Sequence, residues 1–256
     1  MKNIPERESS PMRSLERALH ILTVMEETGS AMGVTDLGRA SQLSKGTVTR
    51  MLSVLEKYGY AEKRKGRYRI GPAVLSLANA YVVGNDLTRV ALPILQELVQ
   101  TSEETASLFV RFGFKRILVQ RVEGIRPLRF ILPIGECLPL HVGAGKVLAA
   151  AMPETEFLQM LDELGEIRLA NGQPITREAL LLEMERVRKQ GYAVSLGERM
   201  FGIVAVAAPV MDADGATIAA VSLAAAKERM TPEKIERFSI AVRDAASAIS
   251  EGWQKS

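Results

Sequence analysis

The chain has 256 residues, of which 47% are hydrophobic, and its net charge is +3. A chain of this length and composition is predicted to fold as two domains. The single cysteine, Cys137, excludes an intrachain disulfide, and no apolar run reaches the roughly 18 residues of a membrane-spanning helix, so we expect a cytoplasmic protein that does not associate with a membrane.

The positive charge is concentrated near the N-terminus. Residues 1–71 contain 13 Lys or Arg against 8 Asp or Glu, a net charge of +5, whereas the remaining residues contain 20 against 22. A basic excess confined to one segment indicates a polyanionic partner for that segment.

Residues 14–57 are predicted to form three short helices. Ser14 is a suitable N-cap and Gly29 a suitable end for the first helix, while Thr35 and Ser44 are suitable N-caps for the second and third. Apolar residues recur at helical spacing, and those expected to face inward are Leu15, Ala18, Leu19, Leu22, Met25, Leu37, Ala40, Val48, Met51, Leu52 and Leu55. The short connection between the second and third helices makes the segment a helix-turn-helix candidate.

The third helix has a basic and hydroxylated side opposite its apolar side. Base edges in a major groove accept hydrogen bonds from Arg, Lys and Thr, and hydroxyl groups together with a helix N-terminus bind phosphates. These groups lie in the first two turns, where a recognition helix contacts bases. The residues predicted to bind DNA here are Ser44, Lys45, Gly46, Thr47, Thr49 and Arg50, with Ser53 and Lys57 flanking them.

The following segment, "AEKRKGRYRIG", predicts two short strands that turn near Gly66, the wing of a winged helix. Its basic residues are predicted to contact phosphates with an affinity that falls as salt rises; they are Lys63, Arg64, Lys65, Arg67 and Arg69. The alternative is an ordinary three-helix domain whose charged face is only solvated. The order of capped helix, basic helix and basic hairpin favours DNA binding.

Residues 72–105 predict two helices separated by a break at residues 84–86. Pro72 suits the first turn of the earlier helix, which has apolar residues on more than one side. This pattern predicts a homodimer, with a dimer of dimers as a further assembly, because a helix-turn-helix that binds paired half-sites generally needs two copies. Packing of this helix on its own domain is the alternative.

From residue 105 the pattern changes to strands, then helices, then strands and a final helix. Strands are predicted over 105–113, 115–124, 128–135, 192–198, 202–211 and 216–226, and helices over 143–152, 154–165, 176–192 and 231–249. A "DADG" turn joins the last two strands, and Thr231 with Pro232 begins the last helix. The order predicts an α+β domain with one antiparallel sheet and flanking helices.

The sequence offers little for catalysis. The two histidines, His20 and His141, and the cysteine provide no ligand set for zinc, and a Cys137/His141 nucleophilic pair lacks an evident third group. "HVGAGKV" departs from a phosphate-binding loop, since Leu140 and Val147 replace the required Gly and Ser/Thr. We therefore expect no catalytic residue, no metal and no cofactor, while an enzyme that carries a DNA-binding module stays the alternative.

Several motifs resemble the IclR family of bacterial transcriptional regulators: "SLERALHILTVMEE", "VTDLGRASQLSKGTVTRMLSVLEKYGY", "GECLPLHVGAGKVLAA", "GYAVSLGE" and "GIVAVAAPVMDADGATIAAVSL". Gln42 stands where this family's turn often has Gly, a possible left-handed position, and the stretch between His141 and Gly145 is one residue shorter than usual. The expected organisation is a disordered N-terminus (1–12), a winged helix-turn-helix domain (13–71), a linker helix (72–87) and a GAF/profilin-like domain for effector binding and oligomerisation (88–256).

The resemblance also implies an effector pocket. The glycine-rich turn of "GAGKVLAAA" lines that pocket in the family, which implies this role for Gly143 and Ala144, where bare N–H groups could hold a carboxylate or hydroxyl. The strand positions that match other pocket residues are Ser195, Ala205, Ser222 and Ala224. Leu128 and Phe130 alternate on "PLRFILP" and are candidates for an apolar wall. Core packing is the alternative for each position.

Together these features predict a regulator of transcription that binds double-stranded DNA at a palindromic operator and responds to a small molecule, an organic acid or an aromatic metabolite. Two other classes of function stay open. One is a winged helix that contacts protein or RNA, and the other is the enzyme with a DNA-binding module named above.

Overall fold

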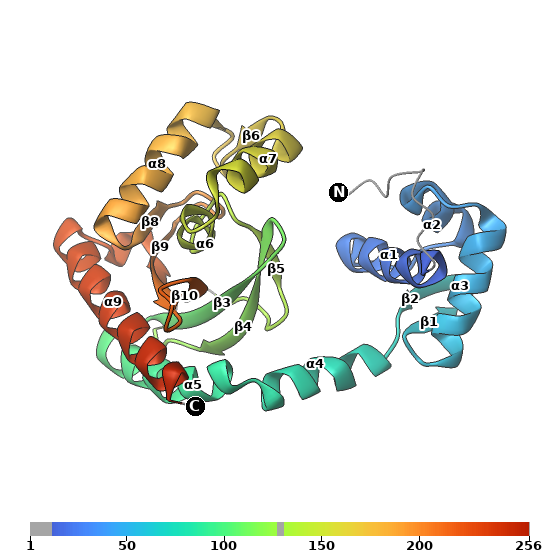
Figure 1. Ribbon diagram of the computed structural model, residues 1–256, viewed down its shortest axis with the longest axis horizontal. Coiled ribbons are helices and arrows are strands. Elements are labelled where there is room, and N and C mark those ends of the chain that lie inside the picture. Colours follow the sequence, from blue (N-terminus) through green and yellow to red (C-terminus); the bar gives the residue numbers. More distant parts are fainter. Residues whose placement is uncertain (1–11, 127–130, 256) are drawn as a thin grey trace. The chain divides into compact units, whose positions relative to one another are not determined.

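The computed structural model describes residues 12–126 and 131–255 (Figure 1). The chain divides into two compact units, Met1–Tyr81 and Val82–Ser256. The segment 1–11, which was expected to be disordered, lies outside the described residues, as do the two proposed wall residues Leu128 and Phe130.

The first unit contains helices α1 (Arg13–Thr28), α2 (Val34–Ser41) and α3 (Lys45–Lys57), followed by strands β1 (Ala61–Arg64) and β2 (Arg67–Ile70). Its small core is formed mainly by residues from the three helices, including Ile21, Leu37 and Leu52, each 0% exposed, together with Tyr68 of β2. The winged helix-turn-helix predicted for residues 13–71 is therefore the observed arrangement of elements.

The apolar side predicted for α1 was partly correct. Met25 is buried, and Ala18 and Leu22 pack against the core, whereas Leu15 and Leu19 are 51% and 54% exposed. Ile21 and Val24 are buried in addition, because periodicity identifies apolar residues but not which of them meet α2 and α3. The predicted N-cap was also wrong: Met12 is at this position without a side-chain cap, and the C-cap is Gly29 as predicted.

The turn between α2 and α3 has a left-handed residue. Gln42 is the C-cap of α2 with φ = 57°, the backbone conformation suspected from the sequence. Helix α2 begins after Gly33, so Thr35 is an internal residue and not the predicted N-cap. Ser44 caps α3 as predicted, since its Oγ accepts a hydrogen bond from the Thr47 N–H at 3.2 Å.

Strands β1 and β2 pair in an antiparallel hairpin whose turn residues, Lys65 and Gly66, both have positive φ. Positive φ at both central positions is the mark of a tight hairpin turn that matches strand twist. After the hairpin come α4 (Ala73–Gly84) and α5 (Asp86–Ser102), separated at Asn85, where the break was predicted.

The second unit is built on a six-stranded antiparallel sheet with the order β5-β4-β3-β10-β9-β8. Its strands are β3 (Thr105–Phe112), β4 (Lys115–Val122), β5 (Cys137–Pro139), β8 (Ala193–Leu196), β9 (Ile203–Met211) and β10 (Thr217–Ala226). The central strands β3 and β10 are buried along most of their length, as expected for strands covered on both faces.

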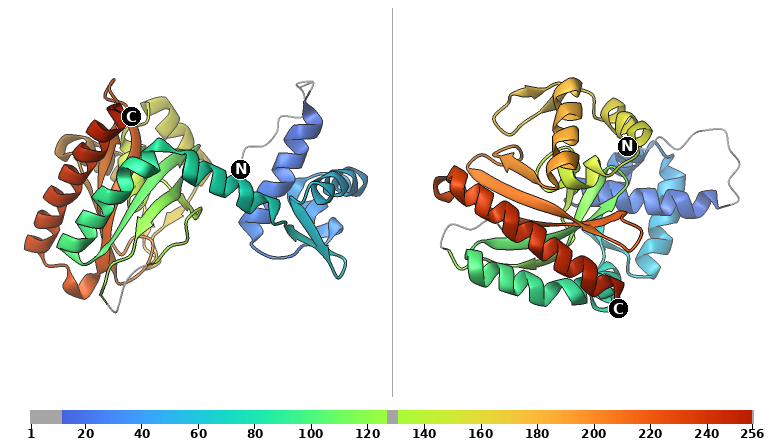
Figure 2. Two further views of the ribbon diagram at one scale, coloured as in Figure 1. Left: turned by 90° about the horizontal axis from the view of Figure 1, so that it is seen from below. Right: turned by 60° about the vertical axis from the view of Figure 1, so that its left-hand side comes forward.

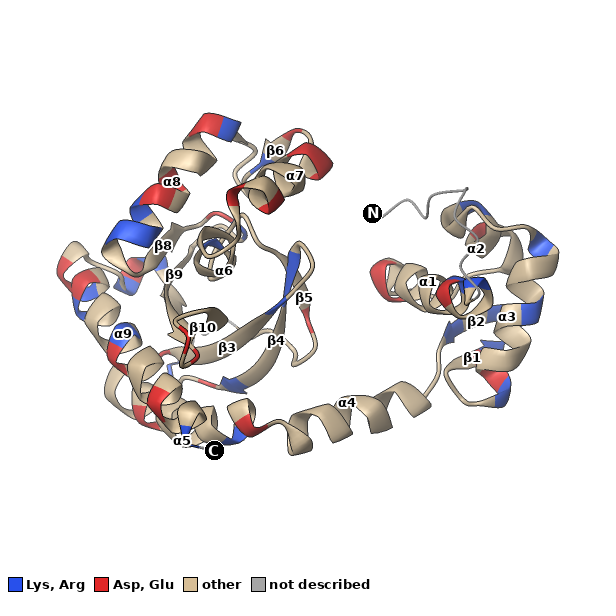
Figure 3. Ribbon diagram, in the orientation of Figure 1, with Lys and Arg blue, Asp and Glu red and all other residues tan. Residues whose placement is uncertain are grey.

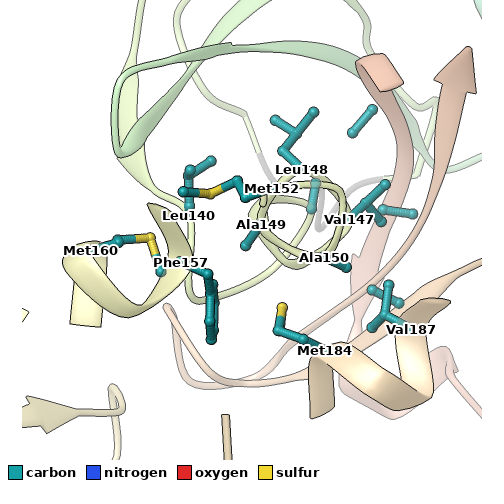
Figure 4. Packing of buried hydrophobic residues seen from close by; sticks show 14 of the residues in the cluster. Leu140, Val147, Leu148, Ala149, Ala150, Met152, Phe157, Met160, Met184 and Val187 are labelled. Carbon is teal, nitrogen blue, oxygen red and sulfur yellow. The ribbon is translucent and has the colours of Figure 1, made fainter. Parts of the chain in front are cut away.

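Helices cover the two faces of this sheet. On one face α5 and α9 (Pro232–Gln254) lie side by side and share a core with β3, β9 and β10 (Figure 1, Figure 2). On the other face α6 (Gly145–Ala150), α7 (Glu154–Leu164) and α8 (Arg177–Gln190) enclose a second core. Every residue of α6 is buried, and apolar side chains from α7 and α8 surround it (Figure 4). The predicted α+β domain with flanking helices is confirmed.

One local prediction for this unit was wrong, and one element was missed. The third strand was expected over 128–135, but the described part of that range contains no strand, and β5 lies further on at Cys137–Pro139. A small hairpin of β6 (Ile167–Arg168) and β7 (Pro174–Ile175) was not predicted, because each strand is too short to show an alternating pattern. A short 3-10 turn, Lys227–Arg229, connects β10 to α9.

Candidate functional site

Helix α3 presents a basic surface to solvent. Lys45, Gly46, Thr49 and Arg50 are exposed, and the first turn of α3 contains no acidic residue (Figure 3). A Cβ added at Gly46 would meet no atom within 4 Å, so another surface could approach the backbone there. An exposed helix with this charge can enter a major groove.

Thr47 was expected to project outward with these residues, and the structure contradicts that expectation. Its side chain is buried, and its hydroxyl lies 3.0 Å from the hydroxyl of Ser44. The inward position follows from the helical repeat, since Thr47 lies one turn before Met51, which packs against the core. Thr47 therefore supports the start of α3 from inside.

The wing carries the second basic group. Lys63, Arg64 and Lys65 are exposed, and the ammonium of Lys63 lies 5.5 Å from the centroid of the Tyr68 ring. Arg67 is held within the unit, because its Nε donates to the carbonyl of Ala31 at 2.9 Å.

Arg69 forms an ion pair with Glu62 at 2.9 Å on the same hairpin. With Arg67 and Arg69 both engaged, the cations at the tip of the wing are the ones most open to a partner.

A cavity lies on the α6 face of the sheet in the second unit, where six of the predicted effector residues meet. These six are Gly143, Ala144, Ser195, Ala205, Ser222 and Ala224. Strand register explains the convergence: Ser195 pairs with Ala205, Ala205 pairs with Ala224, and Ser222 pairs with Ser107. Paired residues in antiparallel strands point to the same face, so one small patch of the sheet forms the cavity floor.

The N–H groups of the glycine-rich turn bind acceptors within the protein. The N–H of Gly143 donates to Oε2 of Glu198 at 3.0 Å, and the N–H groups of Gly145 and Lys146 donate to the carbonyls of Val142 and Gly143. These donors were predicted to be free for a ligand. The carboxylate that occupies the turn is the protein's own Glu198.

Lys146, Glu183 and Glu198 form an ion cluster behind this turn, in which Lys146 is buried and the two carboxylates are partly exposed. The ammonium of Lys146 donates to Glu198 at 2.5 Å, to Glu183 at 2.8 Å and to the carbonyl of Val194 at 2.6 Å. All three of its protons therefore have acceptors, and the geometry compensates the burial of its charge.

Three charged residues line the same cavity and were missed by sequence reasoning: Arg116, Glu198 and Arg199. Arg116 had a detectable signal. It alternates in phase with Leu118 on β4, so a charged residue falls on the face that the strand buries. For Glu198 and Arg199, which follow β8 in a turn, periodicity carried no such signal.

Cys137 and His141 were considered as a catalytic pair. The side chain of Cys137 is half-buried, and Nδ1 of His141 is buried with no hydrogen-bond partner among the described residues. Burial, followed by the positive charge of Arg116, lowers the pKa of His141 below 6.5, so the imidazole is neutral at pH 7. No cluster of three or more metal-ligating side chains occurs within residues 12–126 and 131–255.

Helix α4 buries none of its side chains, although most of them are apolar. Its exposed hydrophobic residues include Leu75, Leu77, Tyr81 and Val83, of which Leu75 and Val83 are each 73% exposed. Apolar residues on several sides of one uncovered helix are typical of an interface. Across the part of the chain that the structure describes, no helix has the length and hydrophobicity to cross a membrane.

Comparison with known proteins matches both units to family models. Residues 14–65 match the model for the IclR helix-turn-helix domain, and residues 79–251 match the model for the C-terminal domain of the bacterial transcriptional regulator IclR. The HTH-type transcriptional repressor AllR of Salmonella typhi is 31% identical over 241 residues, which cover 93% of this chain and 89% of that protein.

Solved structures show the same fold. A putative IclR transcriptional regulator from Silicibacter sp. TM1040 has a TM-score of 0.83 and 26% identity, with 94% of this chain and 96% of that chain covered. An IclR homolog from Microbacterium hydrocarbonoxydans, complexed with 4-hydroxybenzoate, has a TM-score of 0.74 and 22% identity, with 95% and 100% covered.

Proposed function

The chain belongs to the IclR family of bacterial transcriptional regulators, and on this premise we propose that it represses transcription from a palindromic operator and is controlled by a small-molecule effector. The AllR relatives are named as repressors, which supports a regulator rather than an enzyme. As a regulator of bacterial DNA it acts in the cytoplasm, and we assign it neither a catalytic residue nor a cofactor.

The observation that carries this proposal is the exposed basic side of α3. Lys45, Thr49 and Arg50 would contact base edges, while Ser44 and the backbone at Gly46 would hold a phosphate beside the start of the helix. Lys63, Arg64 and Lys65 on the wing would contact phosphates of the flanking backbone. Thr47 and Arg67 act indirectly, since one hydrogen-bonds Ser44 and the other the backbone of Ala31.

A palindromic operator requires two copies of the basic surface. We assign the dimer contact to α4, since its exposed Leu75, Leu77, Tyr81 and Val83 would be covered by a second copy of the same helix. Two-fold symmetry would then pair the two α3 helices at the spacing of two half-sites. A dimer of dimers would extend this assembly through the second unit.

The effector would occupy the cavity on the sheet of the second unit. Gly143, Ala144, Ser195, Ala205, Ser222 and Ala224 line that cavity, which offers hydroxyl groups among small apolar side chains. The ligand of the Microbacterium homolog is an aromatic acid, which supports an organic acid or an aromatic metabolite as the effector of this chain. Coupling between effector and DNA is typically worth about 1–3 kcal/mol, enough to change operator occupancy severalfold or more.

Selection from random double-stranded DNA by the full-length protein tests the proposal. We expect a palindrome to be enriched, and we expect Arg50→Ala and Lys45→Ala to weaken binding to it by about tenfold or more, because each good base contact is worth about 1–3 kcal/mol. Glu56→Ala, on the same helix but outside the basic side, is the matched control with unchanged affinity.

Enrichment of no palindrome, or near-normal binding by both variants, would remove the assignment of α3. Selective binding of RNA would support the RNA-contact alternative, and turnover of a bound metabolite would support the enzyme alternative.

A further inference from the structure

Helix α3 has a glycine, Gly46, in the middle of its exposed side. It lies in the first turn, and its exposed neighbours are Lys45, Thr49 and Arg50. Residues three and four apart are adjacent on a helix surface, so Thr49 and Arg50 flank the place where a side chain is missing. Ser53, also exposed, continues the same side one turn after Thr49. The basic surface of α3 therefore has a gap the size of one side chain.

Nothing in the unbound protein requires glycine at this position. A Cβ added at Gly46 would meet no atom within 4 Å, and the backbone there does not have the positive φ that favours glycine. Glycine also makes a helix less stable than alanine does, because it loses more backbone freedom on folding. Gly46 therefore destabilises α3 without relieving any contact among the described residues.

Gly38 shows the opposite case in the same unit. A Cβ at Gly38 would lie 3.0 Å from the carbonyl oxygen of Leu43 and 4.0 Å from Cγ2 of Val48, so a side chain there would push α2 away from the turn and α3. The remaining described glycines of the first unit have positive φ, cap a helix or lie against other backbone; they are Gly29, Gly33, Gly59, Gly66 and Gly71. Among these glycines only Gly46 has no such role, so a requirement for it can come only from a bound partner.

The side chains around the gap are available to contact bases. In the part of the chain that the structure describes, neither Lys45 nor Arg50 forms an ion pair, and the hydroxyl of Thr49 forms no hydrogen bond. Base edges in the major groove offer acceptors to Lys and Arg, and the apolar group on the same edges is the C5 methyl of thymine. Contacts of Lys45 and Arg50 with base edges would bring this floor of the groove against the bare backbone of Gly46.

A gap without a polar side chain suits a methyl group. The Cα of Gly46 offers an apolar surface, and contact with it would remove the methyl group from water without leaving a polar side chain unpaired. The N–H groups of the first turn point along the helix axis, so a phosphate held at the start of α3 does not compete with a base at its side. The two contacts are therefore compatible.

We propose that Gly46 is a specificity-determining residue, which selects a thymine in each half-site of the operator by leaving room for its C5 methyl group against the backbone of α3. The inference rests on the proposed function, since it assigns a base preference to the helix that binds the operator there.

Deoxyuridine in the selected operator tests the inference on the unmodified full-length protein. Uracil pairs with adenine and keeps the hydrogen-bonding groups of thymine but lacks the methyl group. Each thymine is replaced in turn, symmetrically in both half-sites, and Kd is measured at fixed salt. We expect one thymine whose replacement weakens binding about fourfold per half-site, the effect of one buried methyl group. Equal affinity for thymine and uracil at every position would overturn the inference.

Gly46→Ala assigns the effect to this residue. The added methyl group would fill the gap, so the variant should bind the thymine operator about tenfold or more weakly than wild type. Uracil at the critical position should restore part of this affinity, because the colliding base methyl is then absent. Unchanged affinity, or a loss that uracil restores at no position, would count against the inference. An equal loss for specific and random DNA, as expected from a phosphate contact alone, would also count against it.

A measurement of stability and a second variant serve as controls. The Tm of Gly46→Ala should equal or exceed that of wild type, since the new Cβ meets no atom and alanine favours a helix. A lower Tm would show that the fold itself needs this glycine and would contradict the inference. Thr49→Ser removes a methyl group beside the gap and should keep the thymine preference. Loss of that preference in Thr49→Ser but not in Gly46→Ala would assign the thymine to Thr49 instead.

Failure of the inference and failure of the proposed function give different results. A palindrome that wild type binds specifically, with uracil tolerated at every thymine or with no thymine in its half-sites, would reject only the role of Gly46. Absence of specific DNA binding in wild type would reject the proposed function.

Discussion

The two units of this protein carry their functional cations in opposite ways. In the first unit Lys45, Arg50 and Lys65 are exposed to water, whereas in the second Arg116 and Lys146 are 3% and 2% exposed. One exposed charge contributes little free energy to a single ion pair, and salt screens it. Several exposed charges together can still bind a polyanion. A buried charge has lost its hydration and interacts strongly with one partner. Burial thus distinguishes the exposed cations of the first unit, which can act together on a polyanion, from the enclosed cations of the second unit.

The largest expected effect tests the buried side of this comparison. Lys146→Met should lower the free energy of unfolding by about 3–5 kcal/mol, because Glu198 and Glu183 would lose the buried cation that compensates them. Chemical denaturation of the full-length protein measures the change. Lys189→Met, at an exposed position of α8, is the control and should stay within about 0.5 kcal/mol of wild type. Similar stabilities of the two variants would show that the buried cation is no more important for the fold than the exposed one.

The Glu104–Arg229 pair has one carboxylate for its cation, where Lys146 has two, and should give an intermediate effect. Glu104 is 1% exposed and accepts two hydrogen bonds of 2.7 Å from Arg229. Arg229→Gln should destabilise the fold by about 1.5–3 kcal/mol, since a buried carboxylate loses a charged donor. Arg89→Gln breaks the exposed Arg89–Asp86 pair and should cost at most about 1 kcal/mol. Chemical denaturation measures both losses of stability. A larger loss for Arg89→Gln than for Arg229→Gln would contradict the expected effect of burial.

The exposed side of the comparison predicts a salt effect without a stability effect. Lys65→Ala should leave the unfolding free energy nearly unchanged but weaken operator binding for all sequences alike, and it should reduce the slope of log K against log salt by about 1. Titrations at several salt concentrations measure the slope. An unchanged slope would mean that the tip of the wing makes no phosphate contact.

The smallest expected effect concerns pH. An unfolded chain protonates His141 below about pH 6.5, whereas in the folded protein burial and Arg116 lower its pKa, so the fold binds this proton only at more acidic pH. The contribution to stability is therefore fully present above pH 6.5 and decreases as the pH falls below it. His141→Asn should flatten the stability profile between pH 6.5 and 5.5. Parallel profiles for the variant and wild type would show that folding does not measurably lower the pKa of His141.

Local chemistry accounts for the parts of the fold that sequence reasoning predicted correctly. Ser44 and Thr231 each accept a backbone N–H three residues later, and a cap of this kind involves only neighbouring residues. The paired strands β9 and β10 follow from alternation and a tight turn between them, which are also local features. The basic side of α3 was visible for the same reason, because one helical repeat sets both its apolar and its polar face.

Contacts between distant segments decided the rest. The sequence by itself established most of the order of elements, the family resemblance and the exposed cations of α3 and the wing. Only the tertiary structure decided which apolar residues of α1 are buried, that Thr47 turns inward, and that Arg116 meets Gly143 and Glu198 at one cavity. Periodicity states that a face is apolar or charged, but the partner of that face depends on packing between segments far apart in the chain, and no local pattern encodes it.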